Sequence, residues 1–410
     1  MSSSTTFVIV GGGLAGAKAV EALRDNNFDG QVVLVADEEY LPYERPPLSK
    51  EYLAGKKTLA DFTVRDSDWY RVHDVDLRLS TRATSVDPAA HTVGLADDST
   101  LRYDKLLLAT GSASRRPSIP GSDASGVHYL RHYDDAAALN SVLAEGSSLA
   151  VVGAGWIGLE VAAGARQRGV NVTVVEAAPQ PLLAALGEQV GEIFATLHRE
   201  HGVDLRLGAQ VEEISTQSGK ATGLRLADGS QIGADAVLVA VGAKPNVELA
   251  ERAGLSLGEG GVLVDASLRT SDPDIYAVGD IAAARHPLFG TRIRTEHWAN
   301  ALKQPAVAVA GMLGTPGEYG ELPYFFTDQY DLGMEYAGYA PSFDRVVFRG
   351  DVAKREFVAF WLDGDSRVLA GMNVNIWDVL DDVKALIRTR ASVDAERLAD
   401  PQAPLSELMD

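Results

Sequence analysis

The sequence predicts an α/β protein with two dinucleotide-binding domains, each built on a parallel sheet, and a smaller α+β domain at the C-terminal end. One observation predicts the paired domains: the pattern Gly-x-Gly-x-x-Gly occurs twice, at 11–16 and 153–158, each time directly after a short apolar run. A second observation predicts the C-terminal domain: from about residue 321 the chain changes to short aromatic and β-branched runs.

The first glycine pattern belongs to a complete strand–helix–strand unit. The apolar run 7–10 reads as a buried parallel strand, 14–24 as a helix, and 32–35 as a second strand that is followed by Asp37. The glycines allow a tight turn, close approach of a pyrophosphate, and close packing of helix on strand, while the helix N-terminus offers unpaired N–H groups. Asp37 stands where a ribose-binding carboxylate is expected; a solvated carboxylate at a strand end is the alternative.

The second glycine pattern repeats this unit. The apolar run 149–152, a helix at 159–168 and a strand at 172–175 lead to Glu176, which also has a solvated strand-end carboxylate as its alternative reading. Two such Rossmann-like units imply two dinucleotides in one chain. The natural pair is a flavin dinucleotide and a nicotinamide dinucleotide, since one can reduce the other.

Composition narrows the chemistry. Among 410 residues there is no cysteine, which excludes a dithiol relay, so electrons must leave a flavin directly. The net charge of −20 argues against nucleic-acid binding. No long uncharged apolar run predicts membrane insertion, and the first residues lack signal-peptide features, so we expect a cytoplasmic protein. The histidines show no metal-ligand spacing, so no metal site is predicted.

The loop at 40–50 follows the first unit directly. Its Pro-Pro pair stiffens a segment that carries Arg45 and Lys50, which suggests placed charges; a surface loop with two solvated cations is the alternative. Ser49 is predicted to be the N-cap of a short helix that runs through Leu53.

The middle of the chain predicts an insertion. Short strands and a hairpin at Asp97-Asp98 are expected between 75 and 103, and two near-copies of one strand, at 103–111 and 234–242, suggest that the second unit lies inside the first domain. A strand at 270–280 ends on Asp280, which could accept hydroxyl hydrogen bonds or cap the helix predicted at about 296–313. The C-terminal domain is expected to have strands at 322–330, 345–348, 356–361 and 368–373, and a helix near 377–389.

Several stretches together resemble one family. They are Arg45-Pro-Pro-Leu-Ser-Lys50, Ala109-Thr-Gly111, Gly153-Ala-Gly-Trp-Ile-Gly-Leu-Glu160, Ala277-Val-Gly-Asp280, Glu296-His-Trp298 and Phe326-Thr-Asp-Gln-Tyr330. Nearly the whole chain resembles the bacterial NADH-dependent, FAD-containing ferredoxin reductases of oxygenase systems, the group of putidaredoxin reductase, rhodocoxin reductase and the reductase components of aromatic-ring dioxygenases. The resemblance implies a glutathione-reductase-like architecture: a discontinuous FAD domain at 1–112 and 245–320, an NADH domain at 113–244, and a C-terminal domain at 321–410 that covers the flavin.

The resemblance also implies site residues. Lys50 would lie near the flavin ring, Trp298 would pack near the isoalloxazine, and Glu160 would sit by the nicotinamide and pair with Lys50; these three carry the predicted catalytic roles. Without the resemblance, Trp298 reads as a core residue and Glu160 as a complement to the helix dipole. The full set of predicted cofactor-binding residues is Gly11, Gly13, Leu14, Ala15, Gly16, Asp37, Arg45, Lys50, Ala83, Ala109, Thr110, Gly111, Arg131, Gly153, Gly155, Ile157, Gly158, Glu160, Glu176, Gly242, Gly279, Asp280, Trp298 and Phe326. Close relatives often carry tryptophan where this chain has Tyr324 and Phe326, so a role specific to tryptophan is not expected there.

The implied function is electron transfer from NADH through FAD to a small iron–sulfur ferredoxin, of the [2Fe–2S] or another cluster type, that feeds a monooxygenase or dioxygenase. Hydride would pass from NADH to the flavin, and electrons would leave singly to successive ferredoxins. Two alternatives remain open: an NADH oxidase or quinone reductase, and an NADH-sensing flavoprotein that acts by changing its oligomeric state. The acidic, weakly amphipathic segment 391–410 disfavours a membrane-bound quinone reductase.

Two further expectations concern specificity. Glu176 is followed by Ala177-Ala178-Pro179, a segment without Arg or Lys to receive a 2′-phosphate, which predicts NADH rather than NADPH. Arg285, Arg292, Arg294 and Lys303 stand against a single acid, Glu296, and could form a docking patch for an acidic ferredoxin; internal salt bridges are the alternative.

Overall fold

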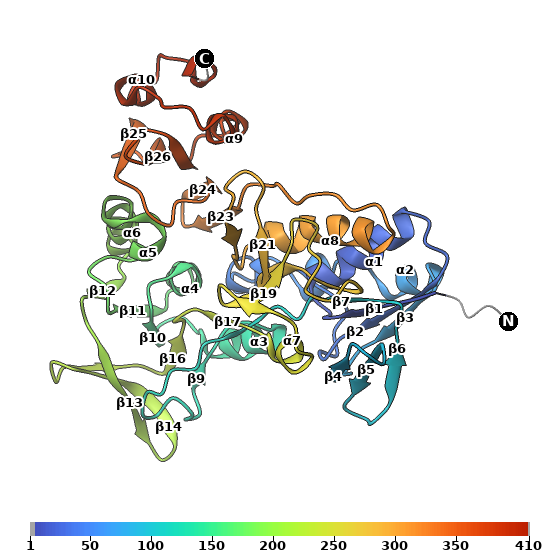
Figure 1. The fold of residues 1–410 in the computed structure, drawn as a ribbon. Helices are drawn as coiled ribbons and strands as arrows, with labels where there is room; N and C mark the ends of the chain where they lie inside the picture. Colours follow the sequence, from blue (N-terminus) through green and yellow to red (C-terminus); the bar gives the residue numbers. More distant parts are fainter. Residues whose placement is uncertain (1–4, 409–410) are drawn as a thin grey trace. The chain divides into compact units, whose positions relative to one another are not determined.

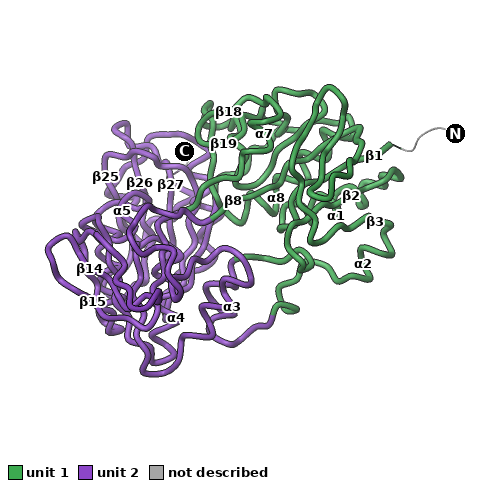
Figure 2. Tube along the Cα trace, turned by 90° about the horizontal axis from the view of Figure 1, so that it is seen from below, with its two compact units in different colours: residues 1–45, 59–113, 243–323 green, residues 46–58, 114–242, 324–410 purple. Residues whose placement is uncertain are grey.

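The computed structural model describes residues 5–408. The chain falls into two compact units (Figures 1 and 2). Unit 1 comprises Met1–Arg45, Leu59–Ala113 and Ala243–Pro323, and unit 2 comprises Pro46–Thr58, Ser114–Gly242 and Tyr324–Asp410. This division is not the three-domain boundary set expected from the sequence, which stays a prediction.

A five-stranded parallel sheet of order β20-β7-β1-β2-β3 forms the centre of unit 1. Its strands are β1 (Thr6–Val10), β2 (Gln31–Val35), β3 (Val75–Arg78), β7 (Lys105–Leu108) and β20 (Ile275–Ala277). The central strands are apolar on both faces and fully buried, as expected for a parallel sheet with covered faces. Helices α1 (Leu14–Asp25) and α8 (Trp298–Met312) pack against each other beside this sheet (Figure 1).

Smaller elements complete unit 1. They are a meander of β4 (Ala83–Asp87), β5 (Thr92–Leu95) and β6 (Thr100–Arg102), a second sheet of β18 (Leu257–Gly258), β19 (Gly261–Val264), β21 (Ala282–Arg285) and β22 (Arg292–Ile293), helices α2 (Ser67–Val72) and α7 (Glu248–Arg252), and the 3₁₀ turns η2 (Leu59–Phe62) and η3 (Gly279–Ile281). The turn between β5 and β6 contains Asp97 and Asp98, so the predicted hairpin is confirmed. Strands β8 (Ser112–Ser114) and β17 (Ala243–Pro245) pair where the chain leaves for the inserted segment and where it returns.

The inserted segment of unit 2 repeats the parallel architecture. Its sheet has the order β12-β11-β10-β16-β9 and consists of β9 (Val127–His128), β10 (Ser148–Val152), β11 (Asn171–Glu176), β12 (Asp204–Leu207) and β16 (Ala236–Val239). The helices are α3 (Tyr133–Val142), α4 (Trp156–Gln167), α5 (Leu183–Leu186) and α6 (Glu188–Glu200), and β13 (Val211–Gln217), β14 (Lys220–Leu226) and β15 (Gln231–Gly233) form an antiparallel extension.

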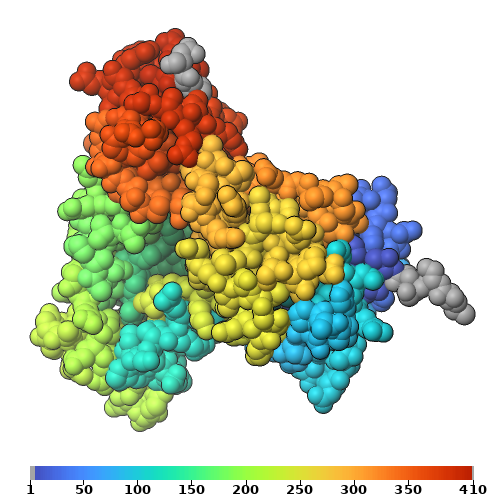
Figure 3. All heavy atoms as spheres, viewed as in Figure 1, coloured from blue at the N-terminus to red at the C-terminus, as the bar shows by residue number. Residues whose placement is uncertain are grey.

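The C-terminal segment forms an antiparallel sheet of order β23-β24-β27-β26-β25, coloured orange to red in Figures 1 and 3. It contains β23 (Tyr324–Gln329), β24 (Leu332–Gly338), β25 (Arg345–Asp351), β26 (Glu356–Leu362) and β27 (Val368–Val374), followed by α9 (Leu380–Thr389), α10 (Ala395–Ala399) and η4 (Leu405–Leu408). Strand β24 was not predicted from the sequence. Strand β23 packs on α4, so this sheet shares a core with the inserted segment.

Three local expectations were inaccurate. Ser49 is the last residue of the 3₁₀ turn η1 (Pro46–Ser49) and caps no α-helix, because only turns follow it through Gly55; its hydroxyl is hydrogen-bonded to Glu160. Helix α4 begins at Trp156 rather than Leu159, because Gly155 already serves as its N-cap. Asp280 does not cap α8, whose N-cap is His297. Within 5–408, no helix is long and apolar enough to cross a membrane, and no cluster of metal-ligating side chains is found.

Candidate functional site

In the glycine turn of unit 1, the first and third glycines are tightly packed, whereas the second, Gly13, has free space beside its backbone. A Cβ atom added to Gly11, whose φ is +129°, would lie 2.1 Å from the Ala109 oxygen, and one added to Gly16 would lie 2.0 Å from the Gly11 oxygen. A Cβ on Gly13 would meet nothing within 4 Å. Packing inside the protein therefore requires the first and third glycines, whereas the second faces free space where a phosphate group can approach the backbone.

The turn of unit 2 has the same arrangement. An added Cβ would lie 2.5 Å from the Ala240 oxygen at Gly153 and 2.2 Å from the Gly153 oxygen at Gly158, but would meet nothing at Gly155. Gly13 and Gly155 are also the N-caps of α1 and α4, and neither helix has a side-chain cap. The first N–H groups of both helices are therefore available to an anion, so both turns fit the pyrophosphate of a dinucleotide.

Each turn has a carboxylate at the end of the neighbouring strand. Asp37 is exposed just beyond β2. Glu176 ends β11, and its two oxygens accept the N–H of Ala154 at 2.7 Å and the N–H of Ala178 at 2.8 Å. The Glu176 carboxylate is thus held beside the glycine turn, where a ribose-binding acid is expected.

The predicted pair of Lys50 and Glu160 is confirmed. Lys50 Nζ lies 2.8 Å from Glu160 Oε1, and the two side chains are only 11% and 6% exposed. Glu160 also accepts hydrogen bonds from Ser49 Oγ at 2.5 Å and from Thr327 Oγ1 at 2.6 Å. Lys50 Nζ lies 5.5 Å from the centre of the Phe326 ring, which gives the ammonium an aromatic neighbour as well. Glu160 is therefore a buried, fully engaged carboxylate and not merely a complement to a helix dipole.

Arg45 is engaged in unit 1. Its guanidinium lies 2.9 Å from Glu38, whose other oxygen accepts a hydrogen bond from the Tyr43 hydroxyl. Burial alone would lower the pKa of Arg45, but the Tyr43 phenol, the hydrogen-bonded Glu38 carboxylate and the Asp280 carboxylate hold this pKa above its ordinary value. The alternative of two solvated cations in the loop is therefore wrong for both Arg45 and Lys50.

Other predicted residues of unit 1 lie at the ends of central strands. Thr110 follows β7, and its hydroxyl donates to the Asn246 oxygen at 2.7 Å. Gly279 and the buried Asp280 follow β20, and the Gly279 N–H donates to Gln304 at 2.7 Å. Because β1, β7 and β20 are neighbouring parallel strands, their carboxyl ends bring the Gly11, Thr110 and Gly279 turns to one edge of the sheet.

Trp298 begins α8, and its indole N–H donates to Glu44 at 3.0 Å, so it is not simply an apolar core residue. Its neighbour His297 was not predicted to belong to the site. Burial lowers the pKa of His297 to about 4, while Asp280 opposes this shift. A single histidine before a helix carries no recognisable pattern.

The remaining predicted residues lie at other points of the fold. Ala83 is buried at the start of β4, Arg131 precedes α3, Ile157 is exposed in the first turn of α4, and Gly242 follows β16. The cofactor contacts of all the predicted site residues stay predictions.

The structure favours the internal alternative for the cationic segment after β21. The Arg292 guanidinium donates to the Val264 and Ala283 carbonyls, and Arg294 donates to the Glu259 and Asp280 carbonyls and pairs with Glu296 at 2.6 Å. Arg292 and Arg294 are therefore not free cations, and the docking patch of Arg285, Arg292, Arg294 and Lys303 stays a prediction. A sum of charges along the chain cannot reveal carbonyl partners that come from distant strands.

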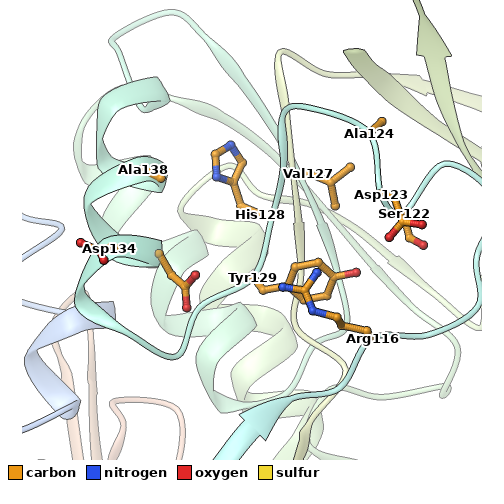
Figure 4. A pocket seen from close by; sticks show the side chains of 10 residues that line it. Arg116, Ser122, Asp123, Ala124, Val127, His128, Tyr129, Asp134 and Ala138 are labelled. Atoms are coloured by element: carbon orange, nitrogen blue, oxygen red, sulfur yellow. The ribbon is translucent and has the colours of Figure 1, made fainter. Parts of the chain in front are cut away.

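A separate pocket of about 330 Å³ lies in unit 2 between the 116–129 segment and α3 (Figure 4). The Arg116 guanidinium lies over the Tyr129 ring at 4.1 Å, and His128 lines the same pocket. Burial lowers the pKa of His128, although Asp135 opposes this shift. The pocket contains none of the predicted site residues.

Comparisons with known proteins agree with this geometry. The family model for pyridine nucleotide-disulphide oxidoreductases matches residues 5–305, and a reductase C-terminal model matches 324–409. The chain is 40% identical over 407 residues to the ferredoxin–NAD(+) reductase component of an anthranilate 1,2-dioxygenase system from Burkholderia cepacia, covering 99% of this chain and 100% of the relative. It is 37% identical to a putidaredoxin reductase from Pseudomonas putida, covering 100% of this chain and 98% of the relative.

Solved structures show the same architecture. A putidaredoxin reductase in a covalent complex with putidaredoxin aligns with a TM-score of 0.95 at 36% identity, over 99% of this chain and 98% of that one. The ferredoxin reductase of the CYP199A2 system from Rhodopseudomonas palustris aligns with a TM-score of 0.94 at 34% identity, over 99% of this chain and 100% of that one. The predicted fold class is confirmed.

Proposed function

Because the chain belongs to the pyridine nucleotide-disulphide oxidoreductase family, we propose that it is an FAD-dependent ferredoxin–NAD+ reductase that passes electrons from NADH to a ferredoxin of an oxygenase system. The observation that carries this proposal is the pair of open glycine turns, at Gly13 and Gly155, in one chain without cysteine. The relatives named above support the ferredoxin as acceptor. The expected cytoplasmic location is retained as part of this proposal.

When bound, FAD supplies the redox chemistry: it accepts a hydride from NADH and releases electrons one at a time. The residues of the chain would bind the two dinucleotides and orient them. In unit 1, the turn at Gly13 would hold the FAD pyrophosphate, and Asp37 its ribose. In unit 2, the turn at Gly155 and the fixed Glu176 carboxylate would hold NADH in the same way.

Lys50 and Glu160 supply the charges for the reaction in this proposal. The Glu160 carboxylate neutralises the charge of Lys50 and holds Lys50 Nζ at 2.8 Å from Glu160 Oε1. A positioned ammonium next to a flavin would stabilise negative charge that develops on its ring during hydride transfer. With no thiol in the chain, the protein offers no dithiol to compete for those electrons.

The proposal is tested with the purified, FAD-loaded protein. NADH-driven reduction of cytochrome c is measured with and without a [2Fe–2S] ferredoxin from an oxygenase system, and ferricyanide reduction serves as the control for the flavin itself. We expect the ferredoxin to stimulate cytochrome c reduction strongly. An active ferricyanide reaction without stimulation by any of a panel of ferredoxins would overturn the proposal.

The same samples separate the alternatives. Oxygen or quinone consumption equal to the ferredoxin-dependent rate would identify an oxidase or quinone reductase. An NADH-dependent change in oligomer size, seen by light scattering without turnover of any acceptor, would identify a sensor.

A further inference from the structure

Strand β23 carries a line of buried polar groups on one of its faces. Along the strand, Phe325, Thr327 and Gln329 alternate with the side chains of the other face. The Phe325 ring lies 4.9 Å from the ring of Trp156, in the first turn of α4, so this face is the one packed on α4. Thr327 and Gln329 are 1% and 0% exposed. Buried polar groups of this kind require partners.

Their partners form a continuous series of hydrogen bonds. Thr327 Oγ1 donates to Glu160 Oε1 at 2.6 Å, and Gln329 Nε2 donates to Thr327 Oγ1 at 3.3 Å. On α6, the Nε2 atom of the fully buried His198 lies 2.8 Å from Gln329 Oε1, and the Tyr330 hydroxyl lies 3.5 Å from His198 Nδ1. The series leads from α6 through β23 to the Lys50–Glu160 pair, all within unit 2.

The proton directions in this series follow from Glu160. Thr327 has one hydroxyl proton, and a carboxylate oxygen can only accept, so Thr327 donates to Glu160 and must accept from Gln329. The Gln329 amide nitrogen is thereby directed at Thr327, and its oxygen at His198. An amide oxygen only accepts, so His198 must carry its proton on Nε2, leaving Nδ1 as an acceptor. Every donor therefore points toward the carboxylate.

We propose that Thr327, Gln329 and His198 are positioning residues that hold the Glu160 carboxylate toward Lys50, and that the charge of Glu160 fixes the Nε2–H tautomer of His198. The role in the reaction rests on the proposed function, whereas the tautomer does not. Neutral His198 agrees with its burial, which lowers its pKa to about 4; the Gln329 hydrogen bond opposes that shift and His201 adds to it. The ionisable groups facing the imidazole are Tyr330 and His201.

Nitrogen NMR of the imidazole tests the tautomer directly. The FAD-loaded protein is labelled with ¹⁵N-histidine, and the His198 signals among the eight histidines are assigned with an H198Q variant. We expect a protonated Nε2 and an unprotonated Nδ1 that do not change between pH 5.5 and pH 9. A protonated Nδ1, or titration of His198 near its ordinary value, would overturn the proposal.

The double substitution K50M/E160Q tests the link to Glu160. Glu160 Oε1 accepts from both Lys50 and Thr327, so K50M removes the ammonium that would keep an amide oxygen at this position. The amide introduced by E160Q can then donate to Thr327, so Thr327 can donate to the Gln329 oxygen and the Gln329 amide can donate to His198 Nε2. We therefore expect the His198 proton to move to Nδ1. An unchanged tautomer in folded K50M/E160Q would overturn the link, and the measurement on the unsubstituted protein decides the case if the double variant does not fold.

The positioning role is tested by stopped-flow reduction of the flavin by NADH without ferredoxin. T327V removes the hydroxyl at nearly constant volume, and we expect the limiting rate to fall about tenfold, the loss of one hydrogen bond to a charged group. The apparent NADH dissociation constant should stay within about twofold, because binding does not require this bond. T327S should recover most of the rate, and T196V on α6, whose hydroxyl lies outside the series, should change neither value. Loss of rate in T327S equal to that in T327V, or a normal rate in T327V, would overturn the proposal.

Discussion

The Lys50–Glu160 pair should be strongly coupled, and a double-mutant cycle can measure this. At a separation of 2.8 Å, two unit charges attract with about 6 kcal/mol at an effective dielectric constant of about 20. Desolvation of two nearly buried ions offsets part of this, so we expect a coupling energy of about 2–4 kcal/mol between K50M and E160Q. E160Q should be the more damaging single change, about 3–5 kcal/mol, because it leaves the Lys50 ammonium buried without its counter-charge. K50M should cost less, because Glu160 keeps the Ser49 and Thr327 donors.

The chain offers a matched control beside this pair. Lys57 and Glu51 lie 3.0 Å apart, but their side chains are 40% and 39% exposed. The cycle of K57M and E51Q should give a coupling energy of at most about 1 kcal/mol.

Urea-induced unfolding of the four variants of each cycle, followed by tryptophan fluorescence, gives both coupling energies. A K50M/E160Q coupling no larger than that of the exposed pair would refute the prediction that burial strengthens this ion pair. Stopped-flow reduction by NADH on the same variants shows whether the coupling carries over to the reaction. We expect E160Q to slow flavin reduction more than it weakens FAD retention.

Three further predictions follow from individual residues. NADH should exceed NADPH in kcat/KM by about a hundredfold or more, because the fixed Glu176 carboxylate would repel a 2′-phosphate; comparable values for the two would contradict this. G16A should lower the thermal stability of unit 1, because its Cβ would lie 2.0 Å from a backbone oxygen. G13A has an ordinary φ of −87° and open space for its Cβ, so it should fold normally and raise the FAD dissociation constant about tenfold. Equal stability losses in the two variants would be inconsistent with an open turn at Gly13. The folded-state pKa of His198, about 4, lies below its unfolded value of 6.5, so its contribution to stability is complete above pH 6.5 and is lost as the pH falls toward 4. The unfolding free energy of H198Q should therefore depend less on pH across this window, by up to about 3 kcal/mol, and parallel curves for the two proteins would refute the shift.

The sequence predicts the parallel cores well because their signals are local. An apolar run, a glycine turn and an amphipathic helix are contiguous, and each glycine's role depends on neighbours within the same unit. The Lys50–Glu160 pair was predicted through the family resemblance and not from spacing, since the two residues are far apart in the chain. Ser49 shows where local patterns are insufficient. From its neighbours in the sequence it was predicted to cap a helix, but its hydroxyl donates a hydrogen bond to the distant Glu160.

The polar series from His198 to Glu160 could not be predicted in the same way. His198 and Gln329 are separated by 131 positions. The alternation of β23 would have placed Thr327 and Gln329 on one face, but it does not say what packs against that face. A similar limit applies to Arg292 and Arg294, because the backbone carbonyls that accept hydrogen bonds from their guanidinium groups cannot be predicted from a charge pattern.

The interrupted path of the chain through unit 1 has a consequence for biosynthesis. Strand β7 pairs with β20, with Leu106 opposite Ile275. The sheet of unit 1 therefore cannot gain its fifth strand until the chain has been synthesised beyond Ile275. At roughly 5–20 residues per second, the ribosome needs about 10–30 s to deliver that partner. The second parallel sheet uses strands between 127 and 239 and has all its partners earlier. On the nascent chain, the sheet of the inserted segment should therefore form before the sheet of unit 1, whose strands flank it in the sequence. Proteolysis of chains stalled near residue 290 should show that the inserted sheet is already protected.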